Sequence, residues 1–387
     1  MPKIFLEIKR VRAELNILLS KLKQLDMPIL FILSIFLVLS TVVIYSATFE
    51  TSYEGLYKNN LITFGVLFIP MIGLSLLDYR VIIHRFSYIL YGSGILLLLF
   101  VSFKGMQING AQRWLSLGGM VFQPSEIMKL FLIMALAKWL KNRDGLPIRI
   151  WHELIPAALL VGIPFYMVLK QPDLGTSIVL LCIFIGILWI GNMQWKHILI
   201  GTLGAASAIA GIVFLYFYDF ELFSAIVKPH QLQRIQTFLD PLSDPDRSWH
   251  VVNSIRAIGT GQLSGEGYLN GLFIRRGFIP YSYADSIFVV IGEEFGFLGC
   301  AVLLMIYFLL IYRMVRISID TQDIEGRYLI VGVISMFSLQ IFENIAMHIG
   351  LMPLTGIALP FVSYGGSSLL TNMLAVGLVL SVKLHPR

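Results

Sequence analysis

The sequence predicts an all-α polytopic membrane protein with about ten transmembrane helices and a long structured extracytoplasmic loop between helices 7 and 8. Three observations lead to this fold class. Hydrophobic residues make up 57% of the chain and charged residues only 13%, a composition well outside that of soluble domains. Apolar runs long enough to cross a bilayer, which takes roughly 20 helical residues, recur along the chain. One polar segment, about residues 219–283, interrupts them.

The first element is a basic amphipathic segment, residues 1–27. Its apolar residues recur at helical spacing between lysines and arginines: Ile4, Ile8, Val11, Leu15, Leu18, Leu22 and Leu25. Such a helix can lie in the inner headgroup layer, dock on a cytoplasmic partner, or serve as a basic anchor that fixes topology, and we favour the anchor. A cleaved signal peptide is not expected, because the next apolar run spans a bilayer by itself.

Ten apolar runs follow, and each is predicted to form one membrane span within a transmembrane domain of residues 28–387. The approximate ranges are 28–48, 59–77, 86–103, 124–140, 153–169, 173–191, 196–218, 284–312, 327–350 and 356–382. Lysines and arginines gather on one side of these spans. The other side, outside the long loop, has only Lys58, Lys104, Arg113 and Lys170. The positive-inside rule therefore predicts that both termini are cytoplasmic and that the long loop is outside.

The net charge of +6 follows from this topology and suits anionic lipid headgroups, so nucleic acid is not an expected partner. The sequence also lacks the signatures of a zinc site and of a phosphate-binding loop. Cys182 and Cys300 fall inside predicted spans, where a thiol behaves as a small apolar residue, and the seven His are scattered. Gly259, Gly261 and Gly265 lack the spacing of a phosphate loop and are expected to be turn residues.

The long loop is where the chemistry is expected. Connections usually take about 4 to 6 residues, and much longer ones are either disordered or functional. Apolar residues such as Phe238, Trp249 and Ile255 argue against a merely solvated linker. The loop also carries Asp240 and Asp244, each before a proline. From the residues alone, an Asp before Pro is an ordinary turn former.

Ionisable residues at the starts of two spans point to function, because burying them is costly. Glu126 and Lys129 are three residues apart, so both lie on one helical face, either as an ion pair or as substrate contacts. Asp173 begins the sixth span, where capping of the helix by itself explains a carboxylate.

Two later spans carry ionisable groups at depth. Glu293 and Glu294 follow Asp285 by about two helical turns, some 12 Å at roughly 1.5 Å per residue. Glu343 and His348 lie in the ninth span. Either a polar cavity or a buried hydrogen-bond network is expected around these groups.

Several strings resemble motifs of the SEDS family (shape, elongation, division and sporulation), which includes RodA and FtsW. These strings are Gly110-Ala111 with Arg113-Trp114, Gln123-Pro124-Ser125-Glu126 with Lys129, Gln171-Pro172-Asp173-Leu174-Gly175-Thr176, Arg234 with Phe238-Leu239-Asp240-Pro241 and Asp244-Pro245, Asp285 with Gly292-Glu293-Glu294-Phe295-Gly296, and Leu359-Pro360-Phe361-Val362-Ser363-Tyr364-Gly365-Gly366-Ser367-Ser368. The match runs from about residue 28 to 384. Gly292 before the two acids leans slightly toward the FtsW, or division, branch. Members commonly read His-Thr-Asp-Phe where this chain has Tyr283-Ala284-Asp285-Ser286.

The resemblance implies a peptidoglycan glycosyltransferase that polymerises lipid II at the outer face of the bacterial cytoplasmic (inner) membrane. It makes Asp244 the general base that deprotonates the acceptor sugar hydroxyl, with Asp240 shaping the turn. Arg113, Lys129, Arg234 and Arg256 become candidates for holding the leaving diphosphate. Further substrate-binding candidates from the matched motifs are Glu126, Asp285, Glu293 and Ser363. A divalent cation, Mg or Mn, could assist the departure of the diphosphate, but the sequence shows no set of acidic residues that would bind it.

The resemblance also implies partners: a class B penicillin-binding protein that crosslinks the strands, and other divisome or elongasome membrane proteins. Two alternative functions stay open from the residues. Prolines and glycines within the spans suit a transporter, so the protein could be a lipid II flippase. It could also be a non-catalytic scaffold that recruits the transpeptidase.

Overall fold

The computed structural model describes residues 21–108, 111–117, 120–141, 146–219, 223 and 245–386, and places a helix at each of the ten predicted spans. These helices are α2 (Met27–Thr48), α3 (Leu56–Leu76), α4 (Tyr79–Lys104), α5 (Pro124–Leu140), α6 (Ile155–Lys170), α7 (Leu174–Ile190), α8 (Trp195–Tyr218), α13 (Ile287–Asp320), α14 (Ile324–His348) and α15 (Gly366–Leu384). A π-helical turn, η1 (Ile150–Leu154), precedes α6. Seven spans of the described chain are long and apolar enough to cross a membrane, and α7 is apolar but shorter. The protein is a multi-pass membrane protein, as predicted.

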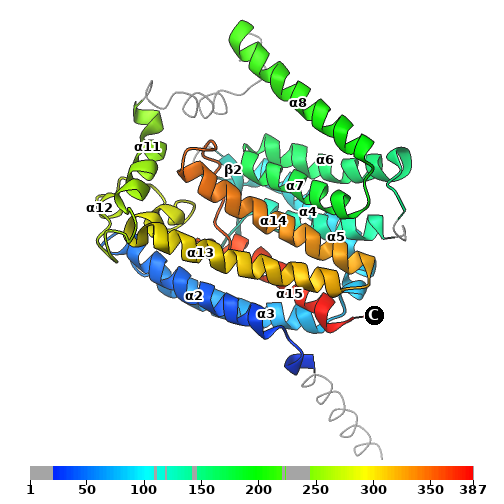
Figure 1. Cartoon of the computed structure of the whole chain (residues 1–387), viewed down its shortest axis with the longest axis horizontal. Coiled ribbons are helices and arrows are strands. Elements are labelled where there is room, and N and C mark those ends of the chain that lie inside the picture. The colour runs from blue at the N-terminus through cyan, green and yellow to red at the C-terminus, as the bar shows by residue number, and fades with distance from the viewer. Residues whose placement is uncertain are drawn as a thin grey trace, which may run out of the picture.

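The helices pack side by side around α5, α14 and α15 (Figure 1). Within the most apolar 18-residue window, 78% of α15 and 61% of α14 is buried, against 22% of α3, α4 and α13. Helix α15 packs on α3, α5 on α4, and α7 on α14. Helix α8 projects away from the bundle, and none of its described residues is buried. The peripheral helices thus turn apolar faces outward, as lipid contact requires.

Aspartates begin three of the helices. Asp26 Oδ1 accepts a hydrogen bond from the Ile29 amide at 3.2 Å, and Asp78 Oδ1 accepts one from the Arg80 amide at 2.9 Å. Asp173 Oδ1 accepts one from the amide of Thr176 at 3.2 Å, which confirms the predicted cap of α7. Each carboxylate satisfies an amide that the first helical turn leaves without a partner, and its charge suits the helix dipole.

Ion pairs tie the helices together at the end of the bundle where the chain terminates (Figure 1). The carboxylate of Asp26 receives Arg313 Nε at 2.9 Å and Lys383 Nζ at 2.5 Å. Asp323 accepts a hydrogen bond from the Tyr79 hydroxyl at 2.5 Å. These contacts join α2 to α13 and α15, and α4 to the start of α14. This is the end that the positive-inside rule predicts to be cytoplasmic.

The structure corrects two predicted boundaries. The last span, expected over 356–382, is helical only from Gly366 to Leu384. Pro353 and Pro360 precede the helix, and Gly356 adopts φ +74°, so this segment runs as irregular chain. The eighth span, expected over 284–312, extends instead from Ile287 to Asp320. Hydrophobicity alone placed both ends wrongly, since it cannot separate an apolar loop from an apolar helix.

A small antiparallel sheet is an addition to the all-α prediction. Its strands are β1 (Met106–Ile108), β2 (Ala111–Leu117) and β3 (Met120–Phe122), in the order β1-β2-β3. The sheet connects α4 to α5. It places β2, which carries Arg113, beside both of these helices.

The described part of the long loop, residues 245–283, is structured, as predicted. It contains α11 (Pro245–Thr260) and α12 (Leu272–Arg275), which lie at the end of the bundle opposite the chain's C-terminus (Figure 1). The remainder of the predicted loop, apart from residues 219 and 223, lies outside the described residues.

Helix α13 is broken at Gly296, and the loop fills the break. Gly296 has φ +63° and ψ −158°, and an added Cβ there would lie 2.4 Å from the amide nitrogen of Gly265. Backbone amides of Glu266 and Phe297 donate to the carbonyls of Glu293 and Gln262, at 2.9 Å each. The expected turn role of Gly265 is confirmed by its φ of +83°. Only glycine fits so close an approach of two backbones.

Candidate active site

A cluster of charged and amide side chains lies at the end of the bundle that carries α11. We call it the polar cluster, and its members are Arg113, Gln123, Glu126, Lys129, Asp173, Asp285 and Glu343. They come from β2, from α5 and the residue before it, from the residue before α7, from the residues before α13, and from α14. The fold thus brings together residues that lie more than 200 positions apart in the sequence.

Arg113 is held at the start of α7. One of its terminal nitrogens lies 3.3 Å from Asp173 Oδ1, and the guanidinium side chain is 18% exposed. The other Asp173 oxygen accepts a hydrogen bond from Gln123 Nε2 at 2.8 Å and contacts Ser125 Oγ at 3.4 Å. Asp173 therefore caps a helix and also positions a cation, so capping alone does not describe its role.

Arg113 also faces Asp285 across Gly356. A Cβ built on Gly356 would lie 3.5 Å from Asp285 Oδ2 and 4.0 Å from Arg113 Nη2. Burial raises the pKa of Asp285 to about 6, and the positive charge of Arg113 acts in the opposite direction. The absence of a side chain at Gly356 leaves room for the carboxyl and the guanidinium to approach the same point.

Lys129 and Glu126 form the ion pair that their spacing predicts. Lys129 Nζ lies 2.9 Å from Glu126 Oε1, and Lys129 is fully buried. Glu343 on α14 is also fully buried, and neither of its carboxyl oxygens has a hydrogen-bond partner among the described residues. The charges of Lys129 and Asp173 act on Glu343. Glu343 thus lies within electrostatic range of residues from α5 and from the start of α7, but no hydrogen-bond network is formed around it among the described residues.

The balance of charge in the polar cluster is acidic. Two cations, Arg113 and Lys129, face the carboxyls of Glu126, Asp173, Asp285 and Glu343. Because a buried carboxylate without a nearby cation is costly, both cations of the cluster are already engaged by carboxylates: Arg113 by Asp173 and Lys129 by Glu126. A diphosphate that binds Arg113 or Lys129 must therefore compete with a carboxylate already paired to it.

The segment around Asp285 is fixed by side chains from α14. Asn344 Nδ2 donates to the carbonyls of Asp285 and Ile357, at 2.7 Å each. His348 Nε2 donates to the Asp285 carbonyl at 3.0 Å. These bonds hold the start of α13 against the irregular segment that precedes α15. They give His348 a structural reason to lie at depth.

His250 on α11 is a residue that sequence reasoning missed. Its Nε2 hydrogen-bonds Ser286 Oγ at 2.9 Å, and its ring lies 5.9 Å from the ring of His348, centre to centre. Burial lowers the pKa of His250 to about 4, so the ring is neutral at physiological pH. Its isolated position in the loop gave no signal. Helix α11 is thereby docked beside Asp285, and it begins at Pro245, directly after Asp244.

The other candidate residues fall into two groups. Asp244, Arg234 and Asp240 lie outside the described residues, so their predicted roles stay predictions. Arg256 lies on an exposed position of α11. Ser363 Oγ accepts a hydrogen bond from the Leu359 amide at 2.8 Å, within the turn that precedes α15.

Glu293 lies away from the polar cluster. Its carboxylate accepts hydrogen bonds from the amides of Phe273 and Ile274, at 2.7 and 3.2 Å, in the first turn of α12. Its neighbour Glu294 accepts one from Ser46 Oγ at 2.5 Å. Glu293 thus holds α12 of the loop on α13, and Glu294 ties α13 to α2. The sequence could not reveal these contacts because the partners are backbone amides and a distant serine. Among the described residues, no group of three or more His, Cys, Asp or Glu is arranged to hold a metal ion.

Comparison with known proteins places the chain in a family. The sequence model of the FtsW/RodA/SpoVE family, which is described as 'Cell cycle protein', matches residues 23–387. The chain belongs to the FtsW/RodA/SpoVE family. The resemblance drawn from the motif strings is thereby confirmed.

Relatives within the FtsW/RodA/SpoVE family come from several branches. The peptidoglycan glycosyltransferase MrdB of Escherichia coli K12 is 35% identical over 363 residues, which cover 94% of both chains. A probable peptidoglycan glycosyltransferase FtsW of Geobacter sp. M18 is 36% identical over 76% of this chain and 77% of its own. The slight lean toward the division branch stays a prediction.

Solved structures agree with the fold. A chain from a peptidoglycan synthase complex that coordinates polymerization and crosslinking superposes with a TM-score of 0.77, at 30% identity, and covers 93% of this chain and 97% of its own. The rod shape determining protein RodA of Thermus thermophilus gives 0.67 at 29% identity, covering 93% and 96%.

Proposed function

We propose that this protein polymerises lipid II into glycan strands, with Asp244 as the base that deprotonates the acceptor sugar. The observation that carries the proposal is the match to the peptidoglycan glycosyltransferase MrdB across 94% of both chains. With the FtsW and RodA relatives, it makes this chain a peptidoglycan glycosyltransferase. The catalytic role of Asp244 rests on its match to the family motif.

The reaction sets three physical requirements. A sugar hydroxyl loses its proton as its oxygen bonds to an anomeric carbon, while the bond from that carbon to the lipid diphosphate breaks. A carboxylate base near the hydroxyl contributes about 10² to 10⁴ in rate. Asp244, the residue before α11 in the sequence, is the carboxylate to which the proposal gives this role.

The diphosphate requires fixed positive charge, since electrostatic stabilisation of a leaving group is a large contribution. Arg113 is the best-placed described candidate, because it is partly exposed and its Nε has no hydrogen-bond partner among the described residues. We propose that the diphosphate displaces Asp173 or Asp285 from Arg113, and that protonation of Asp285 assists this exchange. Arg256 and Arg234 would add charge from the loop.

The proposal includes orientation and partners. The long loop faces the outside of the bacterial cytoplasmic membrane, and both termini face the cytoplasm, as the distribution of basic residues predicts. A class B penicillin-binding protein crosslinks the strands that this chain makes. The likeness to a chain of a complex coordinating polymerization with crosslinking supports such a partner.

The test is lipid II polymerisation by purified protein in proteoliposomes, with and without candidate transpeptidases. Asp244→Asn is expected to abolish glycan-chain formation while lipid II binding persists. Glu54→Gln, an exposed acid in the connection between α2 and α3, is the matched control and should leave polymerisation unchanged. Undiminished polymerisation by Asp244→Asn would refute the base. Altered lipid II transfer across vesicles with no polymerisation by either protein would favour a flippase. Full cellular function of the mutant alongside intact partner binding would favour a scaffold.

A further inference from the structure

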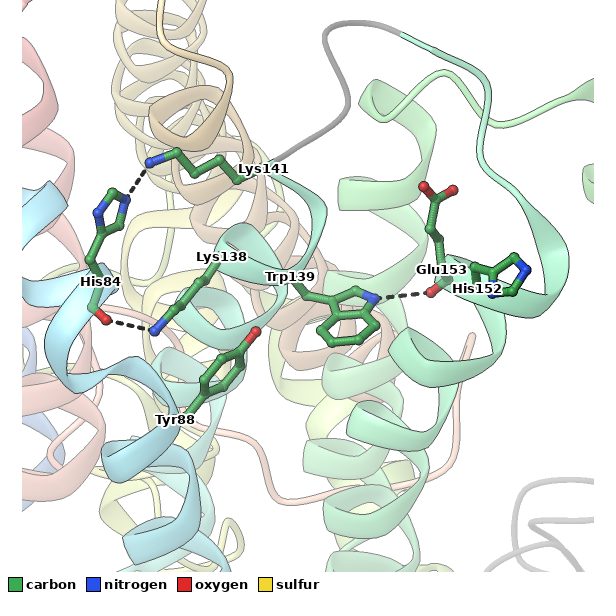
Figure 2. Close-up of a pocket in the computed structure, with 7 residues that line it drawn as sticks. All are labelled: His84, Tyr88, Lys138, Trp139, Lys141, His152 and Glu153. Atoms are coloured by element: carbon green, nitrogen blue, oxygen red, sulfur yellow. Dashed lines mark hydrogen bonds between the residues drawn. The ribbon is translucent and has the colours of Figure 1, made fainter.

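A pocket of about 570 Å³ lies at the end of the bundle opposite the polar cluster. Its walls come from the first turns of α4, the last turn of α5, and η1 (Figure 2). All three elements lie at the same end as the C-terminus, because Arg80 at the start of α4 donates to the carbonyl of His385 at 2.9 Å. The positive-inside rule assigns this end to the cytoplasmic leaflet.

One wall of the pocket is cationic, and its charges are not equivalent. Lys141 Nζ and His84 Nε2 lie 3.2 and 2.8 Å from the same oxygen of Glu325, a fully buried carboxylate. Lys141 and His84 are therefore both engaged by the buried carboxylate of Glu325. Lys138 differs from them, because no described carboxylate lies within ion-pair distance of it. It donates to the His84 carbonyl at 2.6 Å and lies 4.4 Å from the centre of the Tyr88 ring.

The opposite wall consists of Trp139, His152 and Glu153. Trp139 is 39% exposed, and its indole N–H donates to the Glu153 carbonyl at 3.2 Å (Figure 2). In this view the indole stands between Lys138 and the Glu153 side chain. Trp151, also on η1, is 78% exposed. Exposed Trp and Tyr at helix ends are typical of the boundary between acyl chains and headgroups.

We infer that this pocket binds the phosphodiester headgroup of an anionic phospholipid of the surrounding leaflet. Lys138 supplies an uncompensated positive charge, and Lys138 lies in the last turn of α5, at the depth where headgroups lie. Tyr88 and Trp139 supply apolar walls for the glycerol and upper acyl carbons. Basic pockets between transmembrane helices on the cytoplasmic side bind such headgroups.

The rings of Tyr88 and Trp139 indicate that the phosphate belongs to a phospholipid and is not free in solution. A free phosphate gains nothing from Tyr88 or Trp139, whereas a phospholipid contacts both the lysine and the rings. This site goes beyond glycan synthesis, because it faces the leaflet opposite the proposed active site. An occupant would contact α4, α5 and η1 at once, at the place where Lys138 donates to the His84 carbonyl and Trp139 donates to the Glu153 carbonyl.

The test is native mass spectrometry of the detergent-purified full chain with added phosphatidylglycerol, phosphatidylcholine or inorganic phosphate. Wild-type protein is expected to retain phosphatidylglycerol in preference to phosphatidylcholine. Lys138→Gln should weaken phosphatidylglycerol binding about fivefold, the factor for roughly 1 kcal/mol per basic residue near an anionic surface. Lys138→Arg, which keeps the charge, should bind as the wild type does.

Lys196→Gln is the matched control, because Lys196 is exposed at the start of α8 on the same predicted side but outside the pocket. It should leave binding unchanged. Equal phosphatidylglycerol binding by Lys138→Gln and wild type would overturn the site. Displacement of the lipid by millimolar inorganic phosphate would overturn the lipid as its ligand. Equal retention of phosphatidylcholine would do the same.

Discussion

Replacing Lys129 with Met should destabilise the protein strongly. Lys129 is fully buried, pairs with Glu126 at 2.9 Å, and is the cation whose charge acts on Glu343. Removing one partner of a buried pair costs about 3–5 kcal/mol, because the remaining charge stays buried without compensation. At about 2 °C per kcal/mol for a large domain, the midpoint of thermal unfolding should fall by roughly 6–10 °C.

The assay is thermal unfolding in detergent, followed by the reactivity of Cys182 and Cys300, with a double variant as the internal check. Lys129→Met combined with Glu126→Gln removes both charges, so it should recover at least half of the loss. Lys58→Met, at an exposed position of α3, should stay within about 0.5 kcal/mol of the wild type. A loss below about 1 kcal/mol in Lys129→Met, or a double variant less stable than the single one, would refute the pairing argument.

Two further predictions concern Asp285 and the neighbouring Gly356. Burial raises the pKa of Asp285 to about 6 from an ordinary 3.8, so between these pH values the native state keeps a proton that the unfolded state has released. Stability therefore falls as pH rises through that window, by at most roughly 3 kcal/mol, and Asp285→Asn should flatten the pH dependence of unfolding measured from pH 4 to 7. Gly356→Ala should cost about 1–2 kcal/mol of folding stability because of φ +74°, while its new Cβ would make only ordinary contacts with Asp285 Oδ2 and Arg113 Nη2, at 3.5 and 4.0 Å. Gly259→Ala, where a Cβ meets nothing within 4 Å, is its control; equal losses of stability in both would contradict the backbone argument.

Much of the fold was predictable because its signals are local. Hydrophobicity locates a span, and the spacing of Glu126 and Lys129 places both on one face of α5. Capping by Asp173 is likewise readable from its position before the helix. These inferences need only helical geometry and the cost of burying charge.

What the sequence could not supply depends on distant contacts. Glu293 sits in a family motif, yet its partners are the amides of Phe273 and Ile274, which no spacing rule connects to it. His250 gained its place beside Asp285 only through the docking of α11. The small sheet was missed because its strands are short and carry no clear alternation. The acidic balance of the polar cluster depends on the packing of five elements: β2, α5, α7, α13 and α14.

The break in α13 divides that helix into two mechanical parts. The loop is bonded to both sides of Gly296: to the carbonyl and carboxylate of Glu293 before it, and to the amides of Phe297 and Leu298 after it. The far part is anchored to α2 by Arg313. A displacement of α11 or α12 would therefore act on both parts of α13 next to the break, while the end of the helix near Arg313 stays tied to α2. A protein docked on this loop would thus act on α13 at its glycine joint.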